Sequence, residues 1–211
     1  MPEIKLEKLS QKHLEGVVNI TSEAFYGEAV TRCVYDFSRE SVRKSYRLNS
    51  EIMALKAMRG GYPALVALEG DRVVGAAMLK SSKAIPFSVT WRIFLPRLPR
   101  LLRLILKARH RQGQDLKRKM EPSRKELPPS YITLESLAVS SGHRGKGIGA
   151  KLLRELPRVC RDEKASGIYL FTGEEKNRHI YLKNGYRDIK SVKAGPLTIY
   201  HMFMPREKGG G

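Results

Sequence analysis

The sequence has few cysteines and no long hydrophobic run. Its 211 residues include two cysteines, Cys33 and Cys160, and neither lies at metal-ligand spacing from another cysteine or a histidine. Both are therefore expected to be reduced thiols of a cytoplasmic protein. The five histidines are scattered, so no metal site is predicted. Residues 1–10 lack a secretory hydrophobic region, and no apolar run is long enough to span a bilayer.

Acidic residues are also scarce. The chain has 21 Asp and Glu against 40 Lys and Arg, a formal net charge of +19. This excess indicates weak association with a polyanion, RNA or an anionic membrane, rather than a stable nucleic-acid complex. Alternatively, the charge serves solubility and attracts a negatively charged ligand. Hydrophobic residues make up 41% and charged residues 29%, which predicts one α/β domain over residues 1–206 and a flexible tail over 207–211.

Hydrophobic periodicity and turn residues predict a mixed order of strands and helices. Ser10 and Ser38 are candidate caps of the first two helices, and residues 26–37 are expected to form a linker between them. The turn over residues 69–72 predicts a hairpin. The expected strands are 4–9, 64–68, 73–79, 131–139, 168–172, 186–192 and 197–204, and the later helices are expected to follow residue 149 and to span 174–184.

Residues 81–130 interrupt this order and form an insertion that is too long for an ordinary loop. Within it, Leu101 to Lys119 is predicted to form a basic amphipathic helix, preceded by Pro96 and Pro99. Its apolar stripe must be covered by something. The insertion is expected to close as a lid over the protein's own site, and contact with a membrane surface or with a partner molecule remains the alternative.

The stretch over residues 131–153, YITLESLAVSSGHRGKGIGAKLL, combines a strand, a glycine-rich turn and a helix. Gly145, Gly147 and Gly149 allow the backbone to approach a phosphate closely, and the first amides of the helix lack partners within it. The helix dipole favours negative charge at the same place. The spacing matches neither a P-loop nor the dinucleotide fingerprint G-x-G-x-x-G. It therefore predicts another kind of anion site.

The pattern Arg144-x-x-Gly147-x-Gly149, after a strand that ends Leu137-Ala138-Val139, resembles the pyrophosphate loop of the GNAT superfamily of N-acetyltransferases. A later segment, Asn177 to Tyr186, is similar to a second signature of that family. The resemblance implies an α/β GNAT fold: a mixed central sheet of about seven strands, flanked by about four helices, with the basic helical insertion between the third and fourth strands. It also implies acetyl-CoA as the acetyl donor, and no metal.

The same resemblance assigns roles to residues. Backbone groups of the strand would contact the pantetheine arm of acetyl-CoA, the loop amides would hold its pyrophosphate, and Asn177 would also contact the cofactor. Tyr181, four residues further along one helix face, would be the general acid near the sulfur. The cofactor-binding residues are then Leu137, Ala138, Val139, Arg144, Gly145, Lys146, Gly147, Ile148, Gly149 and Asn177.

Glu135 is a carboxylate within an apolar strand, where burial would be costly without a purpose. The two-residue period of a strand places it on the same side as Leu137 and Val139. We expect it to act as the catalytic base, directly or through water, and a salt bridge is the alternative. His143 and His179 are expected to be surface residues.

The sequence says less about the acceptor, the molecule that receives the acetyl group. The insertion before the central strand resembles the subgroup of puromycin-type and related small-molecule amine acetyltransferases, and Trp91 with the leucines suits an apolar or aromatic amine. A cationic insertion over the site would disfavour polyamines and aminoglycosides. We therefore expect acetyl transfer to a primary amine of a small molecule, by direct transfer in a ternary complex. The alternatives are a protein or peptide N-acetyltransferase, including one that works at the ribosome, and a non-catalytic module that binds CoA or nucleic acid.

Overall fold

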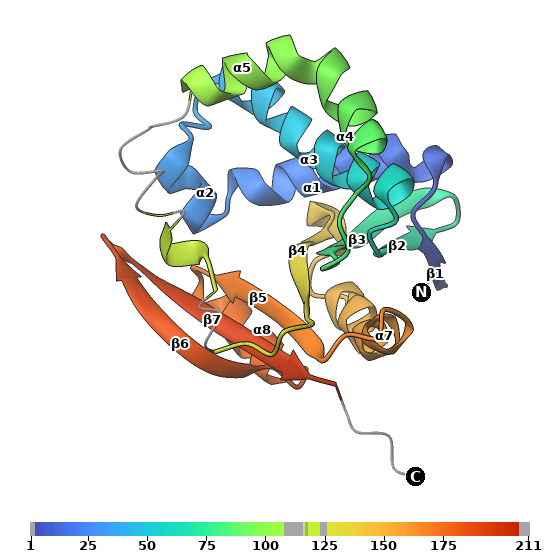
Figure 1. Ribbon diagram of the computed structural model, residues 1–211, viewed down its shortest axis with the longest axis vertical. Coiled ribbons are helices and arrows are strands. Elements are labelled where there is room, and N and C mark those ends of the chain that lie inside the picture. Colours follow the sequence, from blue (N-terminus) through green and yellow to red (C-terminus); the bar gives the residue numbers. More distant parts are fainter. Residues whose placement is uncertain (1–2, 108–115, 117, 123–125, 207–211) are drawn as a thin grey trace.

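The computed structural model describes residues 3–107, 116, 118–122 and 126–206. These residues form one seven-stranded sheet, in the order β1-β2-β3-β4-β5-β7-β6, with helices on both faces (Figure 1). Neighbouring strands are antiparallel except for β4 and β5, which are parallel. The expected mixed sheet is thus confirmed. Its strands are β1 (Ile4–Lys8), β2 (Ala64–Glu69), β3 (Arg72–Lys80), β4 (Ile132–Val139), β5 (Gly167–Thr172), β6 (Arg187–Ala194) and β7 (Leu197–Pro205).

The described helices outnumber those expected, because the first linker and the insertion contain helices of their own. The α-helices are α1 (Leu14–Tyr26), α2 (Ala29–Val34), α3 (Glu40–Gly60), α4 (Phe87–Phe94), α5 (Leu98–Lys107), α7 (Ile148–Asp162) and α8 (Glu175–Leu182). Short 3₁₀ turns are η1 (Gln11–His13), η2 (Leu95–Arg97) and η3 (Ser141–His143).

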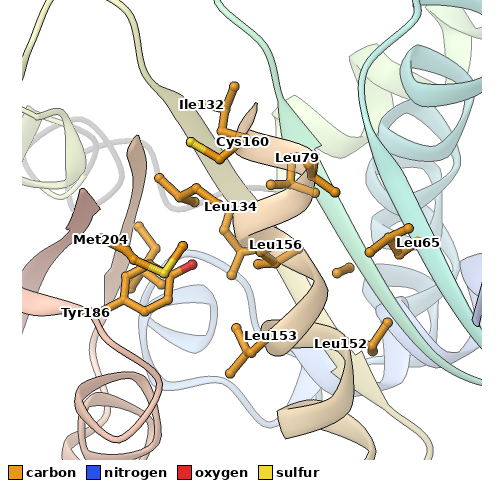
Figure 2. Close-up of a cluster of buried hydrophobic side chains, with 14 of the residues drawn as sticks. Leu65, Leu79, Ile132, Leu134, Leu152, Leu153, Leu156, Cys160, Tyr186 and Met204 are labelled. Carbon is orange, nitrogen blue, oxygen red and sulfur yellow. The ribbon is translucent and has the colours of Figure 1, made fainter. Parts of the chain in front are cut away.

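Helix α7 covers one face of the sheet. Leu152, Leu153 and Leu156 recur at helical spacing, and all three are buried against sheet residues such as Leu79 and Leu134 (Figure 2). This contact is the main hydrophobic core, and it fixes the start of α7 directly beyond the end of β4.

Helices α1 and α3 cover the opposite face. Val17 and Val18 of α1 and Ala54 of α3 pack on Val66 and Met78 of the sheet. The other side of α3 packs against the insertion, as described below. Helix α3 therefore lies between the sheet and the insertion, which forms an outer layer (Figure 1).

Two local predictions at the first helices were wrong. Residues 26–37 are not a plain linker, because α2 forms there: the Glu28 carboxylate accepts hydrogen bonds from the amides of Val30 and Thr31 and caps the helix. Ser38 does not cap α3, whose N-cap residue is Arg39. The Ser38 hydroxyl instead donates to Asp36 at 2.6 Å, as short polar side chains do in turns.

The insertion begins to be helical well before the predicted Leu101. Helix α4, the turn η2 and helix α5 follow one another without an interruption, and the residues at both junctions keep right-handed helical angles. Pro96 lies in η2 and Pro99 in the first turn of α5, where a missing amide costs little. Residues 108–115 and 117 of the predicted helix, and the tail over 207–211, lie outside the described residues.

Candidate functional site

The pairing between β4 and β5 is short. The two strands are in register only at Ile132 with Ile168 and at Thr133 with Tyr169. Beyond that point β4 continues along β3 to Val139, and β5 continues along β7 to Thr172. The edge of β4 that faces β5 is therefore outside any ladder from Leu134 onward. Its backbone amides and carbonyls need other partners, and an extended polar ligand could provide them.

The predicted cofactor residues of β4 and of the loop form one continuous segment. Leu137, Ala138 and Val139 lie at the end of β4 that pairs with β3 but not with β5, and the glycine-rich turn follows. Gly145 and Gly147 have φ of 79° and 78°, a left-handed conformation that favours glycine.

Helix α7 then starts at Ile148, with Gly149 in its first turn. A side-chain carbon added at Gly145 or Gly147 would meet no atom within 4 Å, so the loop faces open space. The first amides of α7 have no partners inside the helix, and Arg144 and Lys146 of the preceding loop are exposed.

His143 anchors this loop, and its predicted surface position was wrong. The ring is buried, with Nδ1 at 2.7 Å from the Ser140 hydroxyl and Nε2 at 3.3 Å from Oε2 of Glu69. Glu69 belongs to β2, so the bond ties the turn after β4 to another strand. The spacing from Ser140 to His143 is the local signal that could have predicted this anchor.

Glu135 lies at a β-bulge. Met78 of β3 pairs with Ser136, but the next residue, Leu79, pairs with Leu134, so Glu135 is an extra residue on β4. A bulge shifts the alternation of side chains by one residue. The prediction that Glu135 shares a side with Leu137 and Val139 was therefore wrong.

Contacts show on which face of the sheet each side chain near the bulge lies. Leu137 and Val139 pack into the core beneath α7. Glu135 instead interacts with Lys56 of α3 and with Lys80, whose charges favour its ionised form. Burial is the larger effect, and it raises the pKa of Glu135 above its usual value of 4.5. No ion pair of Glu135 occurs among the described residues, because neither lysine reaches salt-bridge distance.

Helix α8 holds the second group of predicted residues. Asn177 and Tyr181 lie one turn apart, and both are half-buried. Nδ2 of Asn177 donates to Oε2 of Glu174 at 3.2 Å, and Oε1 of Glu174 accepts from the amide of Ala29 at 3.4 Å. Burial raises the pKa of Tyr181, and the nearby carboxylates of Glu28 and Glu174 raise it further. The phenol therefore stays protonated at neutral pH, beside two carboxylates that sequence reasoning missed.

Tyr181 and Glu135 lie on different faces of the sheet. Tyr181 packs against the same core as Leu137 and Val139, on the α7 side. Glu135 faces α3, where Tyr62 is also close enough for its pKa to be raised by the Glu135 charge, after the larger effect of burial. Glu135 lies on β4 two residues beyond Thr133, where the pairing with β5 ends.

Other features do not add to this site. His179 is exposed, as predicted, and its Nδ1 lies 2.8 Å from the carbonyl of Glu175. Within the described residues, no group of three His, Cys, Asp or Glu side chains could hold a metal ion. A hollow of about 700 Å³ lies beside the loop, between α1 and the turn from β2 to β3, but it is lined by none of Glu135, Asn177 and Tyr181.

The comparison with protein families decides the identity. Residues 17–186 match the Acetyltransferase (GNAT) family, which is most of the chain and includes β4, the glycine loop and α8. This chain belongs to the GNAT acetyltransferase family. The resemblance seen in the loop and in the Asn177–Tyr186 segment is thus confirmed for this acetyltransferase. No curated protein sequence matches it significantly.

Solved structures show the same fold. A Corynebacterium glutamicum protein described as histone acetyltransferase HPA2 and related acetyltransferase superimposes with a TM-score of 0.66 at 18% identity, over 100% of both chains. The ribosomal-protein-alanine N-acetyltransferase of Brucella melitensis gives 0.56 at 18% identity, over 95% of this chain and 99% of that one. The Salmonella typhimurium acetyltransferase yncA, solved with acetyl-CoA, gives 0.57 at 16% identity, over 99% and 97%. At these identities the similarity establishes the fold of the acetyltransferase, not its acceptor.

Proposed function

We propose that this acetyltransferase transfers the acetyl group of acetyl-CoA to a primary amine of a small molecule, by direct transfer in a ternary complex. The observation that carries the proposal is the early end of the β4–β5 pairing, directly before the glycine loop at the start of α7. An unpaired strand edge and a set of free helix amides suit the two parts of acetyl-CoA, its amide-containing arm and its pyrophosphate.

Acetyl-CoA would bind from the α7 side. The amides from Arg144 to Gly149 would hold the pyrophosphate, with the exposed Arg144 and Lys146 adding positive charge. The pantetheine arm would pair with the free edge of β4 at Leu137, Ala138 and Val139. Asn177, which Glu174 already holds by a hydrogen bond, would contact the cofactor from α8.

The amine would approach from the α3 side, where Glu135 lies. A primary amine attacks only in its neutral form, and a buried carboxylate with a raised pKa is a stronger base than an exposed one. Glu135 would take the amine proton, directly or through water. The amine nitrogen then bonds to the thioester carbon, and a strand amide would stabilise the oxyanion. When the C–S bond breaks, the sulfur keeps the electron pair and takes a proton from Tyr181.

The acceptor is proposed to carry an amine without strong negative charge. Glu28 and Glu174, close to Tyr181, favour a cationic substrate at that end of the site. The arginines of α4 and α5 do not oppose this, because both helices pack on the outer side of α3. Polyamines and aminoglycosides, which the cationic insertion was expected to disfavour, are therefore included among the amines to be tested.

Acylation of a protein is the second candidate. The net charge of +19 would attract the chain to ribosomal RNA, and the Brucella melitensis protein of similar fold is described as acting on a ribosomal-protein alanine. The third candidate, a non-catalytic module, fits poorly with an open glycine loop and with a tyrosine on α8 that stays protonated.

Turnover separates these candidates. CoA release would be followed with a thiol reagent while purified protein and acetyl-CoA are mixed with polyamines, aminoglycosides, aromatic amines, or peptides with free N-termini. We expect release with at least one small-molecule amine, and its loss in Glu135→Gln and Tyr181→Phe. Release with peptides alone would favour the second candidate. Tight acetyl-CoA binding without release for any amine would support the non-catalytic reading.

A further inference from the structure

The insertion exposes a continuous apolar stripe. Phe87 is 74% exposed, Trp91 48%, Leu102 52% and Leu106 78%. Together with the other exposed residues of the stripe, they recur every three or four positions through α4, η2 and α5, which places them on one side of a helical rod. The stripe, here called the outer stripe, consists of Phe87, Trp91, Leu95, Leu98, Leu102, Ile105 and Leu106.

The packing of the insertion on the rest of the fold does not need the outer stripe. Ile93 is fully buried against α3, and Leu104 is buried against a cluster that includes Tyr46 of the same helix. Arg97 adds a bond to Glu51 of α3, with Nε at 2.8 Å from Oε1. These contacts hold one side of α4 and α5 on α3 and leave the outer stripe on the opposite side.

The charges beside the outer stripe have one sign. Residues 87–107 contain no Asp or Glu, and their basic residues are Arg92, Arg97, Arg100, Arg103 and Lys107. Arg97 and Arg100 pair with Glu51. Arg92 and Arg103 directly follow Trp91 and Leu102 in sequence, are exposed, and have no ion-pair partner in the described part of the chain. Free arginines therefore flank the apolar stripe on the solvent side.

We infer that the outer stripe is a docking face for an anionic phospholipid bilayer. A helix that lies in a bilayer interface needs an apolar face for the acyl region and cations at its flank for the lipid phosphates. Trp91 suits the boundary between the two, because an indole is apolar with one polar N–H. The net charge of +19 adds attraction to a negative surface. No described helix has both the length and the hydrophobicity of a membrane span.

Three other partners fit the surface less well. A second copy, paired by a two-fold axis, would bring the arginines of one stripe against those of the other. RNA would satisfy Arg92 and Arg103 but would leave the leucines of the stripe in water. The protein's own site is separated from the stripe by α3, so a lid role would require α4 and α5 to leave their packed position.

Vesicle sedimentation tests the proposal. The full chain would be mixed with vesicles of phosphatidylcholine and phosphatidylserine in a 7:3 ratio, or of phosphatidylcholine alone. We expect binding to the anionic vesicles that weakens with salt, and little binding to the neutral ones. Leu98→Ser/Leu102→Ser should lower the partition constant by about tenfold or more. Acetyl-CoA turnover without vesicles should not change, because neither leucine belongs to the proposed site.

Charge reversal supplies a matched comparison. Arg92→Glu/Arg103→Glu should lower the partition constant by about 25-fold or more, since each cation near an anionic surface contributes about fivefold. Arg161→Glu/Arg187→Glu makes the same change in net charge with exposed arginines on α7 and β6, and it should have a much smaller effect. Equal losses in the two variants would show that only net charge matters, and would overturn the docking face.

The single tryptophan reports insertion directly. Trp91 is the only Trp in the chain, so its emission should shift to the blue and be quenched by brominated lipids when anionic vesicles are added. Binding to RNA without binding to vesicles would overturn the proposal. A blue shift that depends on protein concentration alone would indicate a dimer and would also overturn the proposal. A blue shift that depends on acetyl-CoA and an amine would indicate a lid, with the same consequence.

Discussion

Replacing Glu135 by glutamine tests the proposed chemistry most directly. The change keeps the shape of the side chain and removes its ability to accept a proton. A primary amine with a pKa of about 10.4 is neutral in only about 1 molecule in 2,500 at pH 7. If Glu135 takes the proton within the complex, its loss should lower kcat/KM at pH 7 by about 10²–10³-fold, within the range of general base catalysis.

The pH dependence of the variant makes the prediction specific. Without the base, only the free amine reacts, so kcat/KM of Glu135→Gln should rise about tenfold per pH unit between pH 7 and pH 9. The wild-type profile should show an acid limb with an apparent pKa above 4.5, because burial raises the pKa of Glu135. Initial rates of CoA release, with the chemical step shown to limit turnover, are the measurement.

A control variant separates this effect from the loss of any partly buried carboxylate. Glu163 pairs with Lys83 at 3.0 Å and bonds Ser81, away from the site, so Glu163→Gln should keep wild-type activity. Wild-type kcat/KM for Glu135→Gln at pH 7 would refute the assignment of the base. It would leave Glu135 a structural role, as a half-buried carboxylate near the charges of Lys56 and Lys80.

Although Glu135→Gln should lower the activity, it should raise the stability of the fold at high pH. Because the folded state raises the pKa of Glu135, folding favours the protonated carboxyl. That contribution is fully present below the unfolded pKa and is lost as the pH rises through the folded pKa. Glutamine cannot ionise, so Glu135→Gln should be more stable than wild type at pH 8 and nearly equal to it at pH 4. Urea unfolding at both pH values, followed by circular dichroism, measures the difference.

Three further predictions concern the loop, the acid and the core. Gly147→Asp places a negative side chain at the start of α7 and should weaken acetyl-CoA binding by about tenfold or more in calorimetry. Gly147→Ala is the control, because it has the same left-handed strain of about 1 kcal/mol but no charge. It should bind acetyl-CoA much more tightly than Gly147→Asp does. Tyr181→Phe should lower kcat by about 10²-fold with little change in acetyl-CoA affinity, and an unchanged kcat would mean that water protonates the thiolate. Leu156→Ala removes a fully buried side chain and should lower the free energy of unfolding by about 2–5 kcal/mol in urea titrations, whereas a loss below about 1 kcal/mol would contradict the packing described for α7.

Sequence patterns predicted the elements whose signals are local. The glycine loop, the aliphatic helix after it and the hairpin before the insertion all formed, because periodicity and turn residues act over a few positions. The left-handed conformations of Gly145, Gly147 and Gly185 agree with glycines at turns and helix ends. The sequence by itself was also sufficient for the family, since both signatures are contiguous.

Properties that depend on contacts between distant residues needed the tertiary structure. The bulge at Glu135 arises from its register with β3, which no period along β4 reveals, and it moved the carboxylate to the α3 side. Glu174 and Glu28 meet Tyr181 only after α2 packs beside α8. The sequence predicted an apolar stripe on the insertion, but it did not indicate that the side with Ile93 and Leu104 would be the buried one. Packing on α3 decided it, and left the outer stripe on the side of α4 and α5 that faces away from α3.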